Sequence, residues 1–207
     1  MKTECLVLGL LHTNCYLIYD EGTKDAVIID PATSYIKIQN KINELELNPR
    51  YIILTHAHSD HIMALDAISG LYPEAKVCIG EHDAVALNDA ELSLCSYFRN
   101  QPPTKKPDEL LKDGQIINIA NTSITVIHTP GHTCGSISLK YDDSLISGDT
   151  LFYESVGRTD FETSNSADLI NSIKNRLFAL PRETVVYPGH GEQTTIGHET
   201  DNNPFVW

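Results

Sequence analysis

The chain contains the heptapeptide Thr-His-Ala-His-Ser-Asp-His at residues 55–61. Its three imidazoles and one carboxylate are all good ligands for a divalent first-row metal ion. Residues 51–54 before it are apolar or aromatic and include two β-branched residues, which is typical of a buried strand. Alternate side chains of an extended chain share a face, so His56 and His58 are expected to point the same way. Asp60 and His61, which follow, stand at the start of a predicted helix. The fold must therefore bring the end of a strand and the start of a helix close together, with all four side chains in one small volume.

Three later turns each place one ligand-type residue beside glycine, directly after a short apolar run. These residues are His132, Asp149 and His190. Glycine permits a tight turn with unusual backbone angles, which can push the neighbouring side chain out of the edge of a sheet. Each turn alone would more often be an ordinary turn than a ligand site, but the four sites together predict a metal centre. The predicted ligands are His56, His58, Asp60, His61, His132, Asp149 and His190, enough for two ions with Asp149 as a shared bridge.

The arrangement of these motifs resembles the metallo-β-lactamase superfamily. The resemblance rests on His-x-His-x-Asp-His at 56–61, Gly-His-Thr at 131–133, Gly-Asp-Thr-Leu-Phe at 148–152 and Pro-Gly-His-Gly at 188–191, and it extends from about residue 10 to residue 204. Within the superfamily the chain is most similar to glyoxalase II-like hydrolases, in particular to their short single-domain bacterial form. The stretch Val-Gly-Arg-Thr-Asp-Phe at 156–161 and the ending at 197–205 are features of that form.

This resemblance implies a dinuclear centre. One ion would be held by His56, His58 and His132 and the other by Asp60, His61 and His190, with Asp149 and a hydroxide bridging them. The ligand set accepts Zn²⁺, Fe²⁺ or Mn²⁺; Zn²⁺ is the default expectation and iron its main rival. Bound metal lowers the pKa of water from 15.7 to roughly 7, so the bridging hydroxide could attack a carbonyl carbon. Asp60 is predicted to be catalytic as well as a ligand, because its carboxylate is the best placed to steer that nucleophile.

Short strand-like runs alternate with segments of helical spacing along the chain. Strands are predicted at 5–10, 14–19, 26–30, 51–55, 76–79, 115–119, 123–128, 136–140, 144–147 and 184–187. Helical spacing occurs around 38–45, which Pro49 is expected to close, and at 62–68, 84–87 and 169–177. This order suggests two packed sheets with outer helices, and the resemblance implies the same α/β class: a four-layer αβ/βα sandwich of two mixed sheets with the metals at one edge. One domain is expected over residues 1–207, without the C-terminal helical domain that binds glutathione in longer glyoxalase II enzymes.

Thioester hydrolysis is the expected reaction. A thiolate, with a reference pKa of about 8.5, leaves a tetrahedral intermediate without much protonation, whereas an amine usually needs a proton donor that the motifs do not supply. The resemblance implies a substrate such as S-lactoylglutathione. Arg158, nine residues after Asp149, could bind a substrate carboxylate in bidentate fashion. An equally good interpretation is a structural ion pair between Arg158 and Asp160.

Other activities remain open at this level. A persulfide dioxygenase of the same fold would use one iron, held by two histidines and an aspartate. Another hydrolase of the superfamily, such as a β-lactamase, is a further alternative, although the motifs differ from two of its zinc-dependent classes. A non-catalytic metal-binding protein would not need all seven ligands.

Composition limits the partners. A formal net charge of −13 argues against a nucleic-acid surface. No apolar stretch approaches the ~18–20 residues that a membrane span needs. The five cysteines form no CxxC pair and are odd in number, which favours a reducing, cytoplasmic location. The expected partner is therefore a small-molecule thioester, while the oligomeric state stays undetermined.

Overall fold

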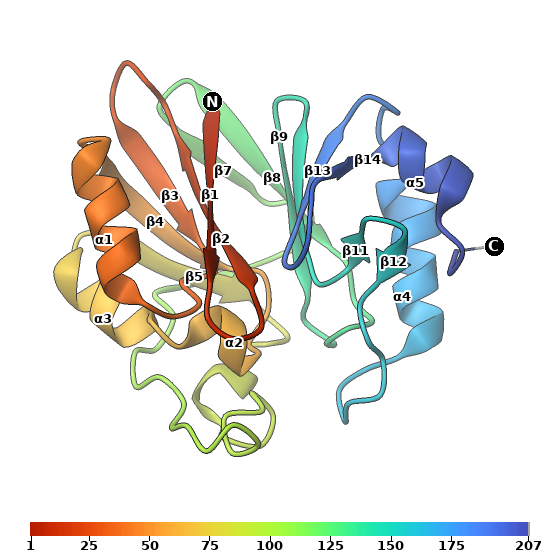
Figure 1. Cartoon of the computed structure of the whole chain (residues 1–207), viewed down its shortest axis with the longest axis horizontal. Helices are drawn as coiled ribbons and strands as arrows, with labels where there is room; N and C mark the ends of the chain where they lie inside the picture. Colours follow the sequence, from red (N-terminus) through yellow and green to blue (C-terminus); the bar gives the residue numbers. More distant parts are fainter. Residues whose placement is uncertain (207) are drawn as a thin grey trace.

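Two six-stranded sheets face each other in the middle of the protein (Figure 1), as the computed structural model of residues 1–206 shows. The first sheet contains, in spatial order, β1 (Lys2–Leu8), β2 (Thr13–Tyr19), β3 (Asp25–Ile29), β4 (Asn48–Leu54), β5 (Lys76–Gly80) and β6 (Glu109–Leu111). The second contains β14 (Thr194–Thr195), β13 (Val185–Pro188), β10 (Ser144–Gly148), β9 (Ile137–Tyr141), β8 (Thr122–His128) and β7 (Ile116–Ile119). A small ribbon of β11 (Leu151–Phe152) and β12 (Ser155–Val156) follows β10.

Both sheets are mixed. Strands β3 to β6 run parallel to one another, while β1 and β2 are antiparallel additions to that sheet. In the second sheet only β10 and β13 pair in parallel. The predicted mixed sheets are therefore confirmed.

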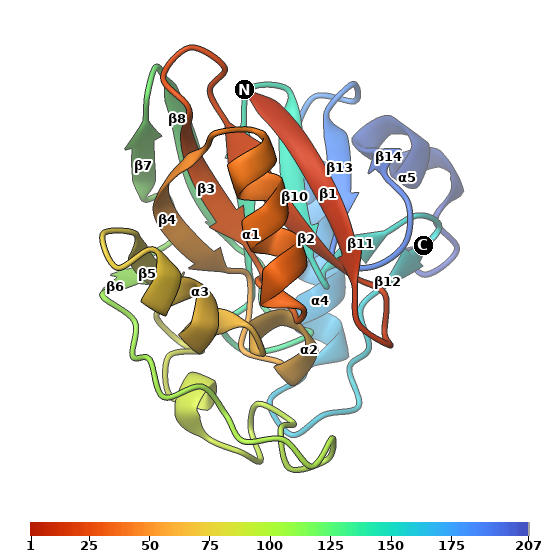
Figure 2. The same cartoon turned by 60° about the vertical axis from the view of Figure 1, so that its left-hand side comes forward.

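Helices cover the two outer faces. Figures 1 and 2 show α1 (Tyr35–Glu44) and α3 (Leu65–Leu71) against the first sheet, and α4 (Ser166–Ser172) with α5 (Ile196–Asn202) against the second. The short α2 (Ser59–Ile62) lies at the lower end of the first sheet, and the π-helical turn Ile173–Leu177 continues α4. The predicted four-layer αβ/βα sandwich is confirmed.

The alternation of side chains explains the layers. In β3, Ile28 packs toward the helices, whereas Val27 and Ile29 pack between the sheets. In β4, Ile52 and Ile53 divide in the same way. A third apolar cluster joins the second sheet to α4 and α5. Strands β3 and β4 are thus buried on both faces, which is why their sequences are continuous apolar runs.

Some predicted elements differ from the structure. Pro49 does not close a helix: α1 ends at Glu44, and Pro49 is the second residue of β4. The ladder between β3 and β4 is irregular next to Pro49, and such a bulge tolerates a residue that cannot donate a backbone hydrogen bond. The helical spacing at 84–87 gives only a 3₁₀ turn at Ala86–Asn88. The short strands β6, β11, β12 and β14 and helix α5 were not predicted.

Strands β4, β8, β10 and β13 all end at the same edge of the two sheets, which is the lower edge of the sheets in Figure 1. Each is followed by one of the predicted ligand motifs. Among residues 1–206, no helix is both long and apolar enough to cross a membrane.

Candidate metal centre

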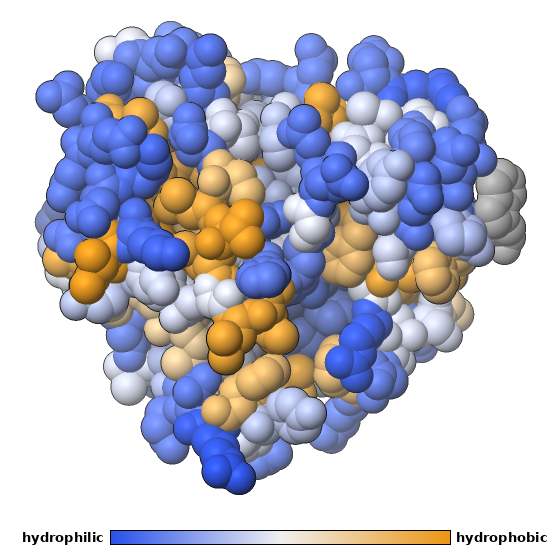
Figure 3. Space-filling view, in the orientation of Figure 1, coloured by the Kyte–Doolittle hydropathy of each residue, from blue (hydrophilic) through white to orange (hydrophobic). Residues whose placement is uncertain are grey.

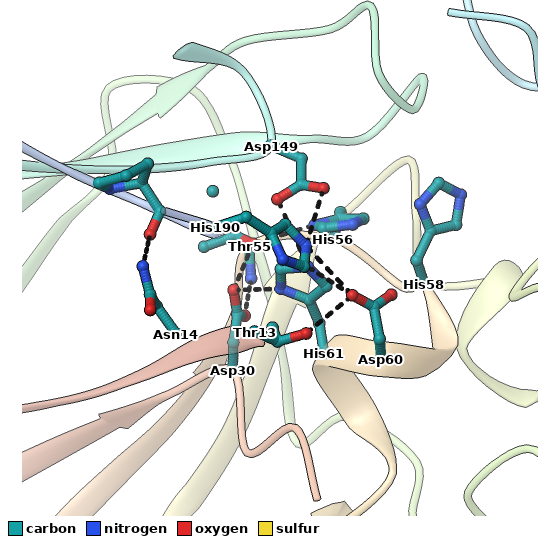
Figure 4. Close-up of polar contacts among 12 residues, drawn as sticks. Thr13, Asn14, Asp30, Thr55, His56, His58, Asp60, His61, Asp149 and His190 are labelled. Atoms are coloured by element: carbon teal, nitrogen blue, oxygen red, sulfur yellow. Dashed lines mark hydrogen bonds and ion pairs between the residues drawn. The ribbon is translucent and has the colours of Figure 1, made fainter. Parts of the chain in front are cut away.

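All seven predicted metal ligands lie together at this edge. Two clusters contain six of them, each with its ligand atoms within 4.8 Å of one another. The first cluster consists of His56, His58 and His132, and the second of Asp60, His61 and His190. Figure 4 shows six of the seven side chains converging from the end of β4, from α2 and from the turns after β10 and β13.

The first cluster is buried. The Nδ1 atom of His58 lies 2.8 Å from Nε2 of His132, and the other ring nitrogen of His132 lies 2.9 Å from the carbonyl oxygen of Arg158. Because a carbonyl oxygen only accepts, Nδ1 of His132 carries the proton, and the lone pair on its Nε2 is directed toward His58 and the cluster. The His56 ring packs edge-on against both of the other imidazoles.

In the second cluster one carboxylate oxygen of Asp60 contacts both imidazoles. Oδ2 of Asp60 is 3.4 Å from Nε2 of His61 and 3.2 Å from Nε2 of His190. The Nδ1 atom of His190 lies 3.0 Å from the carbonyl oxygen of Leu11. As with His132, a backbone carbonyl therefore holds one ring nitrogen and leaves the other directed into the cluster.

Asp149 lies between the clusters. Its Oδ1 is 3.4 Å from Nε2 of His61, and its Oδ2 is 3.6 Å from Nε2 of His132 and 3.5 Å from Nε2 of His190. The carboxylate therefore reaches histidines of both clusters. This position fits the predicted bridge.

Three buried polar atoms test whether metal ions fit here. Nε2 of His56, Nε2 of His58 and Oδ1 of Asp149 have no hydrogen-bond partner among the described residues. Unpaired buried polar atoms are costly and need an explanation such as an ion. Imidazole and carboxylate are also the ligands that zinc, iron and manganese accept. The donor set and the unpaired atoms fit a dinuclear centre.

Burial and neighbouring charges shift the pKa values of the histidines in opposite directions in the two clusters. Burial, together with neighbouring imidazoles, lowers the pKa of His58 to about 3 and holds the pKa of His56 well below its usual range. Burial opposes the charged form of His190, but hydrogen bonds to Asp149 and Asp60 outweigh it and raise the pKa of His190 to about 9. Without metal, the carboxylates are thus neutralised by protons on the second cluster, where a cation could replace them.

Asp30 is a supporting residue that sequence reasoning missed. Its Oδ2 accepts hydrogen bonds at 2.9 Å from Nδ1 of His61 and at 2.7 Å from Oγ1 of Thr55, while its Oδ1 accepts one from the Thr55 amide (Figure 4). A carboxylate behind a ligating imidazole fixes the tautomer and orientation of the ring. Asp30 follows β3 at the same sheet edge, but no glycine or histidine beside it marked the position.

Asp83 and Thr13 were missed as well. The Asp83 carboxylate accepts hydrogen bonds from the Ala57 amide, the Gly135 amide and the Thr133 hydroxyl, so it ties the turn after β4 to the turn after β8. The Thr13 hydroxyl donates to Oδ2 of Asp60 over 2.9 Å. Neither position lies in a motif that suggests such a role.

The site tolerates no side chain at Gly189. A Cβ atom there would lie 2.1 Å from Oδ1 of Asp149 and 2.9 Å from Cε1 of His61. Gly189 is therefore required because the backbone passes directly against two candidate ligands, and not because of an unusual backbone angle.

A cavity of about 460 Å³ opens over the two clusters. Polar side chains of both clusters form its base, and its other walls are mainly apolar. Those wall residues are Leu11, Leu94, Tyr97, Phe98, Phe152, Arg158, Asp160 and Phe161. In Figure 3 a hydrophilic hollow in the lower half of the face is bordered by hydrophobic side chains.

Arg158 lines this cavity and also makes the alternative ion pair. Its Nε and Nη2 atoms bind the two carboxylate oxygens of Asp160 at 3.0 and 2.7 Å. The guanidinium carbon lies 4.7 Å from the centroid of the Phe161 ring, and the side chain is 69% exposed. The structure thus shows the ion pair with Asp160 and places Arg158 in the cavity wall, while its binding of a substrate carboxylate stays a prediction.

Comparison with known proteins gives a family and a range of activities. The family model described as "Metallo-beta-lactamase superfamily" matches residues 8–190. A probable metallo-hydrolase of Bacillus subtilis, YqgX, is 36% identical, with 100% of this chain and 98% of that protein aligned. The hydroxyacylglutathione hydrolase GloC of Haemophilus influenzae is 31% identical, again with 100% of this chain and 98% of its own length covered.

Two solved structures are similar over nearly their whole length. BLEG-1, described as a B3 metallo-beta-lactamase, has a TM-score of 0.94 and 37% identity, with 99% of each chain covered. TTHA1623 in a di-iron-bound form has a TM-score of 0.86 and 33% identity, covering 98% of this chain and 99% of that one.

Proposed function

The chain belongs to the metallo-beta-lactamase superfamily, and we propose that it is a dinuclear metal-dependent hydrolase that cleaves thioesters such as S-lactoylglutathione. The observation that carries this proposal is the convergence of the two clusters on Asp149 at the base of a cavity. Similarity to the hydroxyacylglutathione hydrolase GloC supports the choice of substrate.

The assignment of ligands follows the clusters. His56, His58 and His132 would hold one ion and Asp60, His61 and His190 the other, with Asp149 between them. When bound, two divalent ions supply an activated water at neutral pH and polarise the carbonyl oxygen of the substrate. Zn²⁺ is the first candidate, and the di-iron form of TTHA1623 supports iron as the alternative.

The protein's own residues position the reacting groups. The Thr13 hydroxyl holds one oxygen of Asp60 in place, so the carboxylate keeps a fixed orientation toward the cavity. In this position Asp60 can accept a proton from the attacking water and orient it toward the substrate. Arg158, at the cavity wall, would bind a carboxylate of the thiol carrier and thereby fix the thioester over the two clusters.

A thiolate leaving group suits the residues around the cavity. His128 and Tyr153 lie near the motifs and are the side chains that could protonate a leaving group, but neither of them lines the cavity. His128 instead lies with Nε2 2.9 Å from the Cys134 carbonyl oxygen, and Tyr153 stacks on His198. A thiolate can leave with little protonation, so the reaction does not depend on a strong acid in the wall.

Hydrolysis of a β-lactam is a second candidate, favoured by the similarity to BLEG-1 over 99% of both chains. Its amine leaving group needs a proton, and Tyr97 is the one phenol among the described residues that line the cavity. A mononuclear-iron dioxygenase is less well supported, because two separate groups of three ligand-type residues, which share no member, lie beside Asp149.

The test is hydrolysis of S-lactoylglutathione by the purified protein, with metals counted by elemental analysis of the same sample. Two ions per chain and release of the free thiol are expected. A β-lactam substrate is assayed in parallel. Cleavage of the β-lactam alone would overturn the thioester proposal, and one iron per chain with oxygen uptake would overturn both hydrolase candidates.

A further inference from the structure

A second cavity of about 340 Å³ lies beside the metal cavity. Its lining comes from the connection between β1 and β2, the segment after β3, the region of α2 and the loop after Phe98. The lining residues include Leu8, Leu10, Ala32, Met63 and Asn100. Neither the family match nor the similar proteins assign a role to this cavity.

The two cavities share part of their wall. Leu11, Asp60 and Phe98 line both of them. Asp60 belongs to the second cluster of candidate ligands, so the second cavity adjoins the residues that would hold one of the ions. Figure 3 shows hydrophobic side chains over the β1–β2 connection, beside the hydrophilic hollow.

The two cavities differ in charge. Arg158 is the one lysine or arginine among the described residues that line either cavity, and it lines only the metal cavity. In the second cavity the one charged side chain is that of Asp60. Arg158 is already paired with Asp160, yet its guanidinium still offers further charged donors to an anionic group. The second cavity offers no such donor among its described lining residues, so an uncharged, apolar group is favoured there.

The exposed apolar side chains at this wall also need an explanation. Leu10 is 97% exposed, and Leu11 and Phe98 are 48% and 40% exposed. Single exposed apolar residues are ordinary, but these three line one cavity together and so form a shared apolar surface. A ligand chain in the cavity would cover them.

We propose that the second cavity is an acyl-chain subsite, so that the preferred substrates are thioesters of medium-length apolar acyl groups on an anionic thiol. This inference rests on the proposed thioesterase function. With the carbonyl at the two clusters and the carboxylate of the thiol at Arg158, the acyl chain passes Asp60 and packs between Leu11 and Phe98.

The test uses thioesters of 3-mercaptopropionate that differ only in their acyl group, from acetyl to octanoyl. For the metal-loaded wild type, kcat/KM is expected to rise about fourfold for each added methylene until the cavity is full, since that is the value of a fully buried methylene. The ketone analogues, in which a methylene replaces the thioester sulfur, give a binding readout without turnover. Their dissociation constants should fall with acyl length in the same way.

Two variants alter the cavity itself. Leu10→Asp puts a charge on a fully exposed lining position, and Met63→Trp fills space. Each is expected to lower the octanoyl-to-acetyl ratio of kcat/KM at least fivefold. Val85→Asp is the matched control, because Val85 is 74% exposed and lines neither cavity. This control should leave the ratio as in the wild type.

The outcomes separate the two proposals. Failure to hydrolyse even the acetyl thioester would overturn the proposed function together with this inference. Hydrolysis of all acyl lengths at one rate, with equal binding of the ketone analogues, would overturn the acyl-chain subsite alone. The subsite would also be refuted if lengthening the thiol, with acetyl held fixed, raised kcat/KM and Leu10→Asp removed that gain.

Discussion

Asp149 is the residue through which the two clusters are joined, since its carboxylate oxygens lie 3.4 to 3.6 Å from histidines of both. We predict that Asp149→Ala removes at least one of two ions per chain and most of the thioesterase activity. Without the negative charge of this carboxylate, the electrostatic repulsion between the two cations would be less well compensated. Elemental analysis and thiol release measure the effect, with the exposed Asp168→Ala as control. Two ions retained in full would contradict the bridging role.

Asp30 acts one step further from the ions. Asp30→Asn keeps the shape of the side chain but removes the negative charge behind the His61 ring. Loss of such an outer partner typically weakens metal binding 10- to 100-fold, and we expect a change of that size. Competition with a chelator measures it, with the partly exposed Asp25→Asn as control. An unchanged affinity would mean that Asp30 serves only the Thr55 turn.

Arg158 is expected to act in substrate binding. Arg158→Ala should raise KM for S-lactoylglutathione more than it lowers kcat, because a contact to the carrier is the same in the ground state and the transition state. Arg176→Ala is a suitable control, since it removes a comparable surface pair with Asp113. A change in kcat alone would place Arg158 outside the carrier site.

The seven candidate ligands could be predicted from sequence because each stands in a recognisable motif that follows an apolar run. Their supports could not. Asp30 and Thr13 act through hydrogen bonds across segments far apart in the chain, and nothing beside them distinguishes these positions from ordinary strand ends. The residues of the cavity wall could not be predicted from sequence either, because Tyr97 and Phe98 lie in a segment without regular periodicity.

At the scale of elements, Asp66 in α3 holds the loop that follows Phe98. Its carboxylate accepts hydrogen bonds from the Thr104 amide, the Thr104 hydroxyl and the Lys105 amide. We predict that Asp66→Ala speeds hydrogen exchange at these two amides at least tenfold. Ser69→Ala, in the same helix, is the control. Exchange at the wild-type rate in Asp66→Ala would show that the loop is held elsewhere.

The same contact should depend on pH. Partial burial opposes the charged form of Asp66, but the hydrogen bonds from Thr104 and Lys105 outweigh it and lower its pKa. A lowered folded-state pKa stabilises the protein above the unfolded value of about 3.9, and this contribution is lost as the pH falls through the folded value. Protection at Thr104 and Lys105 should therefore decrease only below about pH 4, beyond the ordinary slowing of exchange in acid.

Sequence pattern located the long elements better than the short ones. The strands of both sheets were identified because β-branched residues such as Ile52 and Ile53 fill both faces. The prediction that Pro49 closes a helix was wrong because a bulge in the pairing of β3 and β4 accommodates this proline within a strand. The bulge depends on the pairing with β3 and cannot be recognised from the local sequence. Strands of two or three residues, such as β6 and β14, exist only because a neighbouring strand supplies their hydrogen bonds.

At the scale of the whole molecule, the candidate metal centre is formed by residues from both halves of the sandwich. His56, His58, Asp60 and His61 come from the first half and His132, Asp149 and His190 from the second. In the metal-free protein, the close carboxylates and imidazoles must be balanced by protons on His61 and His190, whose pKa values the neighbouring carboxylates raise against the effect of burial. Ions that bind only the folded arrangement therefore stabilise the junction of the halves.

Removal of the metals should accordingly lower thermal stability. A ligand present at 100 times its dissociation constant stabilises the folded state by about 2.7 kcal/mol for each site. For a chain of 207 residues, each kcal/mol corresponds to roughly 2–4 °C in Tm, so chelation of one site should lower Tm by about 5–10 °C. Calorimetry of the metal-loaded and chelated protein measures this, and returning Zn²⁺ should restore the original Tm. Asp149→Ala should respond less to chelation than the wild type, because part of its centre is already lost. An equal Tm with and without metal would mean that the two halves are held by their apolar interface alone.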